Sequence, residues 1–176
     1  MNGPELSPVA ARARWRLRIC VAGLGALFFV TVALLSSGCV LLSNAELVTY
    51  AAVNQVRTDA GLAPLTPDPV LRDVARFHSQ DMAANQRLAH EFDNGCTVIC
   101  VLDTLKVPYA WAGENVEVNN WDWAEAPERA VMKWQNTPGH LANMLNCHYT
   151  RFGAGVTPGE GGRIYFSVVF AGDAAC

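Results

Sequence analysis

Three side chains of this sequence are of types that commonly bind metals or transfer protons, and two of them lie in short segments that contain glycine and asparagine. Glu114 stands between Gly113 and Asn115, and His140 follows a Pro-Gly pair. His90 precedes both, in a chain that contains 4 histidines. Imidazole and carboxylate are ordinary ligands of Zn²⁺, and two histidines with one carboxylate leave a coordination position open for water. A site of this kind can activate water for hydrolysis.

Two interpretations of these three residues stay open. In the first, His90, His140 and Glu114 hold a divalent cation weakly, either Zn²⁺ or another ion. In the second, the two imidazoles share hydrogen bonds with Glu114 and hold the walls of a cleft together without a metal. Hydrolysis needs a further acid or base beside the bound water, and the sequence offers no convincing candidate. We therefore expect a binding function, with a metal-dependent hydrolase that uses these three residues as the alternative.

Residues 1–38 have the pattern of a targeting segment. A basic region precedes an uncharged apolar run, which extends from Ile19 to Leu35. Small residues then lead to Cys39, as in a lipoprotein processing box whose cysteine becomes lipidated, although Ser36 stands where leucine is usual. Plain secretion is one alternative. An uncleaved anchor is another, because no charge interrupts residues 19–45, a stretch long enough to span a bilayer. Each alternative exports the domain at residues 43–176, as a surface lipoprotein, a membrane-anchored protein or a secreted one.

Cysteine usage agrees with an exported domain. Of the 6 cysteines, Cys20 lies in the apolar run of the leader and Cys39 at the processing site, and the others are Cys96, Cys100, Cys147 and Cys176. An even number suits two disulfides in an oxidising compartment. Three pairings exist, and we expect Cys96–Cys100 with Cys147–Cys176. A zinc site built from the four cysteines is the rival interpretation, but only one close pair exists, Cys96 and Cys100, with three residues between them.

The charge of the exported part excludes one class of partner. The leader holds four of the 13 Lys and Arg residues and one of the 16 Asp and Glu residues, so nine basic and fifteen acidic side chains remain. Their net charge is near −6, and no basic cluster lies outside the leader. Nucleic acid and other polyanions therefore have no basic surface on which to bind.

Two helices are expected in the first half of the domain. Ser43 and Glu46 have the spacing of a capping box that opens a helix ending at Gly61. Asp68 then caps a second helix, with a proline in its first position. The apolar stripe of this second helix contains Leu71, Val74, Ala75, His78 and Met82. We interpret His78 as a hydrogen-bonded core histidine rather than a ligand.

The central part of the domain has a less regular pattern. We expect a loop over residues 91–111, a short helix or turn over residues 114–118, a helix from Pro127 that Pro138 ends, and a short helix over residues 139–145. Trp121 and Trp123 are expected to anchor a loop in the core, with a partner surface as the alternative. Asn115 and Asn143 are expected to satisfy backbone carbonyls of loops.

A hairpin is expected at the end of the chain. Residues 151–157 and 163–171 have the composition of strands, and the Gly-rich segment 158–162 joins them. Both faces of the second strand are apolar, which indicates a sheet covered on both sides. Helices first and a hairpin last predict an α+β layered domain.

With these motifs, the chain resembles the CAP superfamily, named for cysteine-rich secretory proteins, antigen 5 and the plant pathogenesis-related proteins, and in particular its short bacterial exported branch. Seven ordered motifs, spread over nearly the whole chain after the leader, carry the resemblance. They are Asn54-x-x-Arg57 with Gly61-Leu62-x-Pro64-Leu65, Ala75-x-x-His78-x-x-Asp81-Met82, Leu88-Ala89-His90, Gly113-Glu114-Asn115-Val116, Ala130-x-x-x-Trp134, Pro138-Gly139-His140-x-x-Asn143-x-Leu145, and Gly153-x-Gly155-Val156 with Tyr165 in the last strand.

The resemblance implies a three-layer α-β-α sandwich with an open cleft that two histidines and two glutamates line. His90, Glu114 and His140 match three of these positions. Thr137 occupies the fourth, which weakens the expectation of strong metal binding, and Glu128 is a poor substitute. The family also makes a small apolar or lipid ligand, a wall component or a host protein plausible partners. The leader would supply the contact with the membrane, through an anchor or a lipid.

Overall fold

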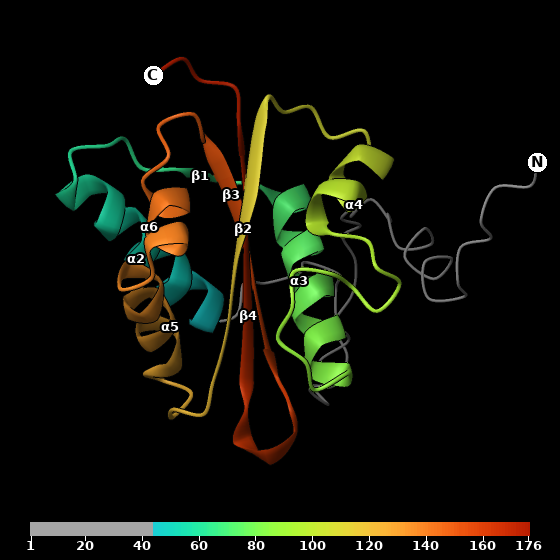
Figure 1. Cartoon of the computed structure of the whole chain (residues 1–176). Coiled ribbons are helices and arrows are strands. Elements are labelled where there is room, and N and C mark those ends of the chain that lie inside the picture. The colour runs from blue at the N-terminus through green and yellow to red at the C-terminus, as the bar shows by residue number, and fades with distance from the viewer. Residues whose placement is uncertain (1–43) are drawn as a thin grey trace, which may run out of the picture. The chain divides into compact units, whose positions relative to one another are not determined.

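A four-stranded mixed sheet lies between two layers of helices (Figure 1). The computed structural model describes residues 44–176. The predicted leader, the lipidation site Cys39 and the capping residue Ser43 lie outside the described residues. The strands follow the order β1-β3-β4-β2, and their bounds are β1 Thr66–Pro67, β2 Trp111–Asn119, β3 Arg151–Pro158 and β4 Ile164–Gly172. Strand β1 runs parallel to β3, and the other neighbours are antiparallel.

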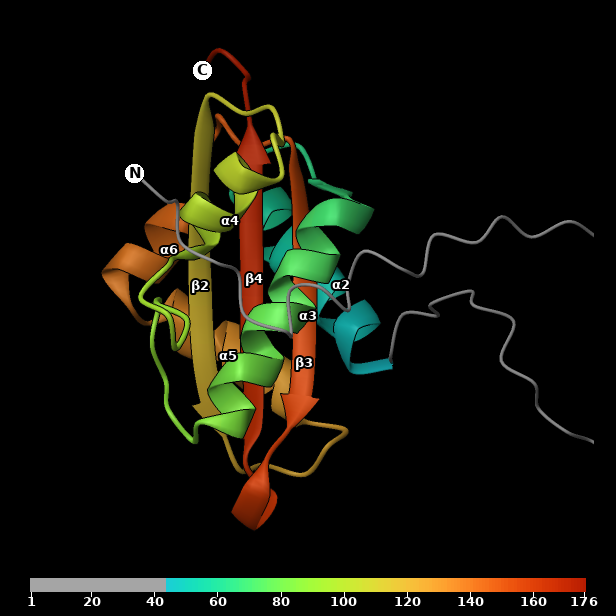
Figure 2. The same ribbon diagram turned by 90° about the vertical axis from the view of Figure 1, so that its right-hand side faces the viewer.

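The helices divide between the two faces of the sheet. One face carries α2, α5 and α6, and the other carries α3 and α4, which cover the strands in Figure 2. Their bounds are α2 Asn44–Asp59, α3 Pro69–Ala84, α4 Val98–Thr104, α5 Ala126–Gln135 and α6 Pro138–Met144. The hairpin turn between β3 and β4 contains a short 3₁₀ helix, Glu160–Gly162. The predicted α+β three-layer sandwich and its C-terminal hairpin are therefore confirmed.

Strand β4 separates two hydrophobic cores because its side chains alternate between them. Phe166, Val168 and Phe170 pack toward α2 and α5, in a cluster that also contains Trp134. Val169 and Ala171 pack toward α3 and α4. Every residue of β4 is buried, as the two apolar faces of this segment predicted.

Helix α3 lies directly against strand β3, because two glycines of that strand have no side chain. A Cβ atom at Gly153 would lie 2.0 Å from the backbone nitrogen of Arg72, and one at Gly155 would lie 2.3 Å from that of Arg76. The N-terminus of α3 is fixed as predicted, since the Asp68 carboxylate accepts hydrogen bonds from Val70 N and Leu71 N. Helix α3 therefore starts at a fixed residue and lies at a fixed distance from the sheet. Together these place His78 on the side of α3 that faces the sheet.

Helices α2 and α6 are tied together by a buried arginine. Arg57, which is 2% exposed, donates to the carbonyls of Ala63, Met144 and Asn146. Asn54, one turn earlier, exchanges two hydrogen bonds with the backbone of Leu65. The Asn54-x-x-Arg57 motif thus positions the segment after α2 and the C-terminal end of α6.

Two elements differ from the predictions. Residues 114–118, predicted as a helix or turn, belong to strand β2, which pairs with β4 over nine residues. Gly and Asn are poor strand formers, so the pairing with β4, rather than local preference, makes this segment a strand. Residues 91–111, predicted as a loop, contain α4, whose seven residues are too few to show a helical period.

The two disulfides connect the predicted pairs. Cys96 bonds to Cys100, and Cys147 bonds to Cys176, so the alternative of a zinc site built from these cysteines is wrong. Within residues 44–176, none of the helices combines the length and apolar composition that crossing a membrane requires.

Candidate functional site

The buried carboxylate of Glu114 on β2 joins side chains from three other parts of the fold. It is 7% exposed. Its Oε1 lies 2.5 Å from Nδ1 of His78 on α3 and accepts a hydrogen bond of 2.7 Å from the hydroxyl of Ser167 on β4. Its Oε2 lies 3.0 Å from Nδ1 of His90, in the segment after α3. Because a carboxylate accepts, both imidazoles donate from Nδ1 to it.

His90 is the exposed end of this network. Its side chain is 50% exposed, whereas that of His78 is fully buried. The bond from Nδ1 to Glu114 fixes the orientation of the ring and leaves Nε2 to bind a ligand. In many metal sites a carboxylate orients a histidine ligand in the same way, through the second ring nitrogen.

His140 approaches the same place from α6. The centres of the His90 and His140 rings are 6.5 Å apart, and the ring planes are inclined by 56°. Nδ1 of His140 is buried and has no hydrogen-bond partner among the described residues. An orphaned imidazole nitrogen of this kind fits a metal ion or a donor from a ligand.

Two asparagines hold α6 against strand β2. Asn115 donates to the backbone carbonyl of His140 at 3.0 Å. Asn143 donates to the carbonyl of Glu114 and to Oδ1 of Asn115, both at 3.0 Å. Both satisfy backbone carbonyls as expected, although these belong to a helix and a strand rather than to loops. Trp134 donates to the carbonyl of Val116 in the same way, so side chains cover this edge of the sheet.

The environment of the cleft shifts the pKa values of His90 and His140 in opposite directions. The hydrogen bond with Glu114 raises the pKa of His90 above its ordinary value, and partial burial opposes that shift. Burial lowers the pKa of His140, and the neighbouring His90 lowers it further. The site therefore combines one imidazole that holds its proton with one that releases it readily.

We expect an NMR titration of the full-length protein to give His90 a higher pKa than His140. Because the pKa of His90 is raised on folding, its protonation stabilises the fold fully below about pH 6.5. That contribution disappears as the pH rises through the folded-state pKa. His140 acts oppositely, since its lowered pKa destabilises the fold as the pH falls below about 6.5. His90→Ala should raise the pKa of His140, and a wild-type His140 that titrates above His90 would refute this assignment.

Within the predicted ligand set of His90, His140 and Glu114, the carboxylate has a different role from the two imidazoles. Both oxygens of Glu114 are engaged by the histidines and Ser167, so the carboxylate orients His90 rather than offering a vacant oxygen. Of the described residues, only Cys147, His148 and Cys176 bring three candidate ligand atoms within 4.8 Å of one another. Their two sulfurs form a disulfide, which leaves no thiolate to bind a metal.

The residue at the fourth cleft position has a local role. The hydroxyl of Thr137 donates to the carbonyl of Lys133, at the end of α5. Glu128 is exposed in the first turn of α5, in keeping with its interpretation as a poor substitute. The two imidazoles are thus the groups that could contact an ion directly.

His78 is the member of the network whose partner the sequence left unidentified. The structure confirms that it is a buried, hydrogen-bonded histidine on the stripe of α3. Its partner is Glu114, which makes it part of the site. The spacing of the α3 stripe identified burial, but nothing in the sequence pairs this histidine with a carboxylate 36 residues later.

The tryptophans of the loop between β2 and α5 differ from their prediction. Trp121 and Trp123, expected as buried anchors, are 49% and 42% exposed. Nonpolar contacts do not bury Trp121; instead, the guanidinium of Arg129 lies 4.2 Å above its ring. The prediction of a buried loop anchor is therefore wrong.

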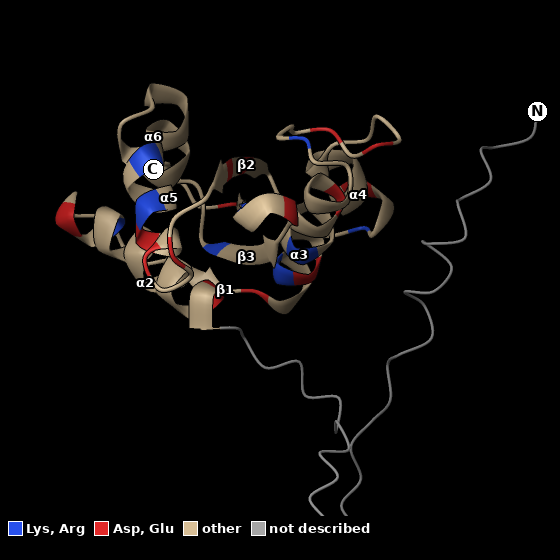
Figure 3. Ribbon diagram, turned by 90° about the horizontal axis from the view of Figure 1, so that it is seen from below, with Lys and Arg blue, Asp and Glu red and all other residues tan. Residues whose placement is uncertain are grey.

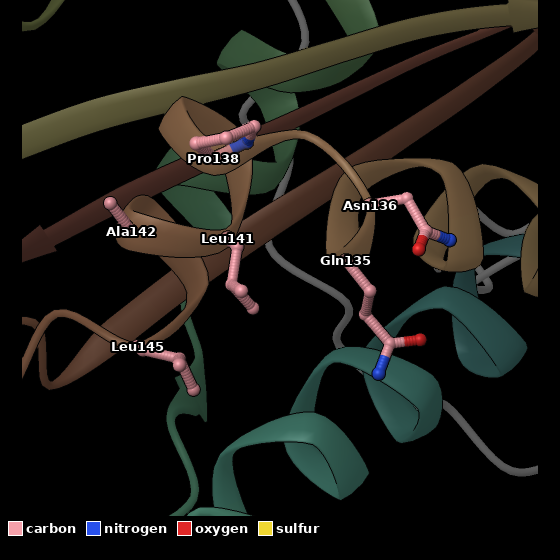
Figure 4. Close-up of a pocket in the computed structure, with 6 residues that line it drawn as sticks. All are labelled: Gln135, Asn136, Pro138, Leu141, Ala142 and Leu145. Carbon is pink, nitrogen blue, oxygen red and sulfur yellow. The ribbon is translucent and has the colours of Figure 1, made fainter.

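A shallow apolar groove lies beside α6 (Figure 4). It has a volume of about 400 Å³, and Pro138, Leu141, Ala142 and Leu145 line it with Gln135 and Asn136 from the end of α5. An apolar or lipid ligand, one of the expected partners, stays a prediction. This groove is an apolar surface on which such a ligand could bind.

Residues 50–170 match the model of the cysteine-rich secretory protein family, CAP. The chain is similar to two proteins of Bacillus subtilis strain 168. It is 32% identical to the uncharacterized protein YkwD over 112 residues, which cover 64% of this chain and 41% of YkwD. It is 35% identical to the uncharacterized membrane protein YlbC over 103 residues, which cover 58% of this chain and 29% of YlbC. The chain thus spans less than half the length of these relatives.

Solved structures share the fold. An extracellular protein with an SCP domain from Bacillus anthracis strain Ames superposes with a TM-score of 0.63 and 28% identity, over 73% of this chain and 40% of that one. The structure of NaASP2 with Zn²⁺ gives a TM-score of 0.53 at 13% identity, over 75% and 85% of the two chains. Manganese-bound Ac-ASP-7, an Ancylostoma-secreted protein, gives 0.54 at 13%, over 80% and 75%. The last two likenesses establish the fold alone.

Proposed function

The chain belongs to the cysteine-rich secretory protein (CAP) family, and we propose that it is an exported, non-enzymatic binding protein whose cleft holds a divalent cation between His90 and His140. Export is supported by the leader pattern of residues 1–38, and by relatives described as an extracellular protein and a membrane protein. The two CAP-fold structures that contain Zn²⁺ or Mn²⁺ indicate which ions to test.

One observation carries the cation site. A half-exposed imidazole, His90, is oriented through Nδ1 by a buried carboxylate and lies 6.5 Å, centre to centre, from a second imidazole whose Nδ1 has no partner among the described residues. A bound ion would act there as a Lewis acid that draws an oxygen or nitrogen ligand into the cleft. His90 and His140 would supply the two protein ligands, and Glu114 would keep the His90 ring in place.

The same contacts favour binding over hydrolysis. The two oxygens of Glu114 together accept hydrogen bonds from His78, His90 and Ser167, which fill three of the about four acceptor positions of a carboxylate and leave little room for a general base. Thr137 stands at the fourth cleft position and engages the carbonyl of Lys133. Two imidazole ligands without a carboxylate ligand also favour weak, exchangeable binding.

Calorimetric titration of the purified full-length protein with Zn²⁺ and with Mn²⁺ tests this proposal. We expect saturable binding that weakens at least about tenfold in His90→Ala and in His140→Ala, and about 10–100-fold in Glu114→Gln, since removal of an orienting partner has that effect. His148→Ala is the matched control, because His148 stacks on Trp111 outside the site, and it should bind as the wild type does. Absence of binding heat, or equal affinity in His140→Ala, would reject the cation site.

A further inference from the structure

A second groove, which the cation site does not use, lies between strand β2 and helix α5. Its volume is about 360 Å³, within the range of small-ligand sites. Glu117 and Asn119 come from β2, and Trp121 comes from the loop that follows. Arg129 and Lys133 come from α5. Among these residues, only Trp121 was part of a predicted site, as the alternative of a partner surface.

The groove has an aromatic wall that is held in place. The ring of Trp121 is 49% exposed, and the Arg129 guanidinium lies 4.2 Å from its centre. Arg129 is itself bound to Glu125, 3.2 Å away and one turn earlier on the same helix. Arg129 covers one face of the ring, and the part that stays exposed offers a stacking surface with an indole N–H at its rim.

The polar groups of the groove are of mixed character. Asn119 donates to the carbonyl of Ala126, while its Oδ1 is buried without a hydrogen-bond partner among the described residues. Burial raises the pKa of Glu117, and Lys133 opposes that shift. Asn136 donates to the carbonyl of Met132, which leaves its own amide oxygen as an acceptor. The groove thus combines acceptors with the cationic donors of Arg129 and Lys133.

These features select a class of ligand. Charges of both signs line the groove, Glu117 from β2 and Arg129 and Lys133 from α5, and Figure 3 shows acidic and basic segments near α5, so neither an anion nor a cation has a uniformly complementary surface. A neutral sugar ring has an apolar face that can stack on an indole and hydroxyl groups that both donate and accept. An acetamido substituent adds an N–H donor, which is the kind of group that the unpartnered Oδ1 of Asn119 lacks.

We propose that this groove binds a neutral glycan of N-acetylated hexosamines, with one sugar ring stacked on Trp121. Glu117 and Asn119 provide acceptors from the strand, and Arg129 and Lys133 provide donors from the helix. Asn119 and Glu114 belong to the same strand, five residues apart, a separation of about 17 Å along a strand. Glycan binding is therefore a function additional to cation binding, and it does not require an ion at His90 and His140.

The probe is the N-acetylglucosamine tetramer, titrated into the full-length protein and followed by calorimetry and by the indole N–H signals of NMR. We expect saturable binding that Trp121→Ala weakens about tenfold or more, because the stacked face is lost. Trp123→Ala is the matched control, since Trp123 is similarly exposed and does not line the groove. It should bind as the wild type does. The glucose tetramer, which lacks the acetamido groups, should bind about tenfold more weakly.

Several outcomes would overturn the proposal. They are the absence of saturable binding, equal weakening in the Trp121→Ala and Trp123→Ala variants, and a tetramer affinity that does not depend on acetylation. Concentration-dependent dimerisation that Trp121→Ala abolishes would identify a second copy of the chain as the occupant instead. The titration is repeated with the His90→Ala/His140→Ala variant and a chelator. Retained glycan binding there supports the proposal even if the cation site fails, and lost binding rejects an independent groove.

Discussion

Replacing Glu114 by alanine should lower the free energy of unfolding by about 3–5 kcal/mol, because the change leaves two buried donors without an acceptor. His78 is 0% exposed and Ser167 is 0% exposed, so both lose their acceptor at a place that solvent does not reach in the folded protein. His90 loses the hydrogen bond that fixes its ring, and its pKa should fall toward the ordinary value of histidine. Chemical denaturation followed by circular dichroism measures the first effect, and an NMR titration measures the second.

Glu117→Ala provides the comparison for this prediction. Glu117 lies three residues further along the same strand and therefore faces the opposite side of the sheet. It is only partly buried and takes no part in the bonds of Glu114. We expect its replacement to change the free energy of unfolding by less than about 1 kcal/mol. If Glu114→Ala costs no more than Glu117→Ala, the hydrogen-bonded network does not stabilise the fold.

Replacing Gly153 by alanine should cost at least about 3 kcal/mol and lower the Tm by about 10 °C or more. The added Cβ would lie 2.0 Å from Arg72 N and 2.1 Å from the carbonyl carbon of Leu71. These are backbone atoms of α3, which cannot move aside without shifting the whole helix. Because α3 carries His78, the shift should also loosen the bond between His78 and Glu114.

Gly139→Ala is the control, measured by thermal unfolding alongside Gly153→Ala. A Cβ at Gly139 meets no atom within 4 Å, and its φ angle lies outside the left-handed region. Its replacement should alter the Tm by only a few degrees, in either direction. Similar losses in the two variants would show that contact with α3 does not explain the loss of stability at Gly153, because reduced flexibility of the unfolded chain would by itself stabilise both variants.

Local patterns in the sequence identified much of the fold. The Asp68-Pro69 pair marked the start of α3, and a proline followed the end of α5. Apolar residues on both faces of β4 indicated a sheet buried on both sides. These predictions succeeded because capping, proline geometry and side-chain periodicity act over a few neighbouring residues. Strand β2 failed the same test, since Gly113 and Asn115 have weak strand preference and only their pairing with β4 makes them extended.

The sequence by itself determined which side chains could form the site: His90, Glu114 and His140 were identified from residue type and surrounding motif. Only the tertiary structure decided which of the three is a buried hydrogen-bond acceptor and which two can contact a ligand. The β2–β4 register sets Val116 opposite Ser167, and the close approach of α3 to Gly153 and Gly155 brings in His78. These contacts make Glu114 the buried acceptor of His78, His90 and Ser167. Contacts between residues tens of positions apart depend on strand register and packing depth, which short-range patterns do not encode.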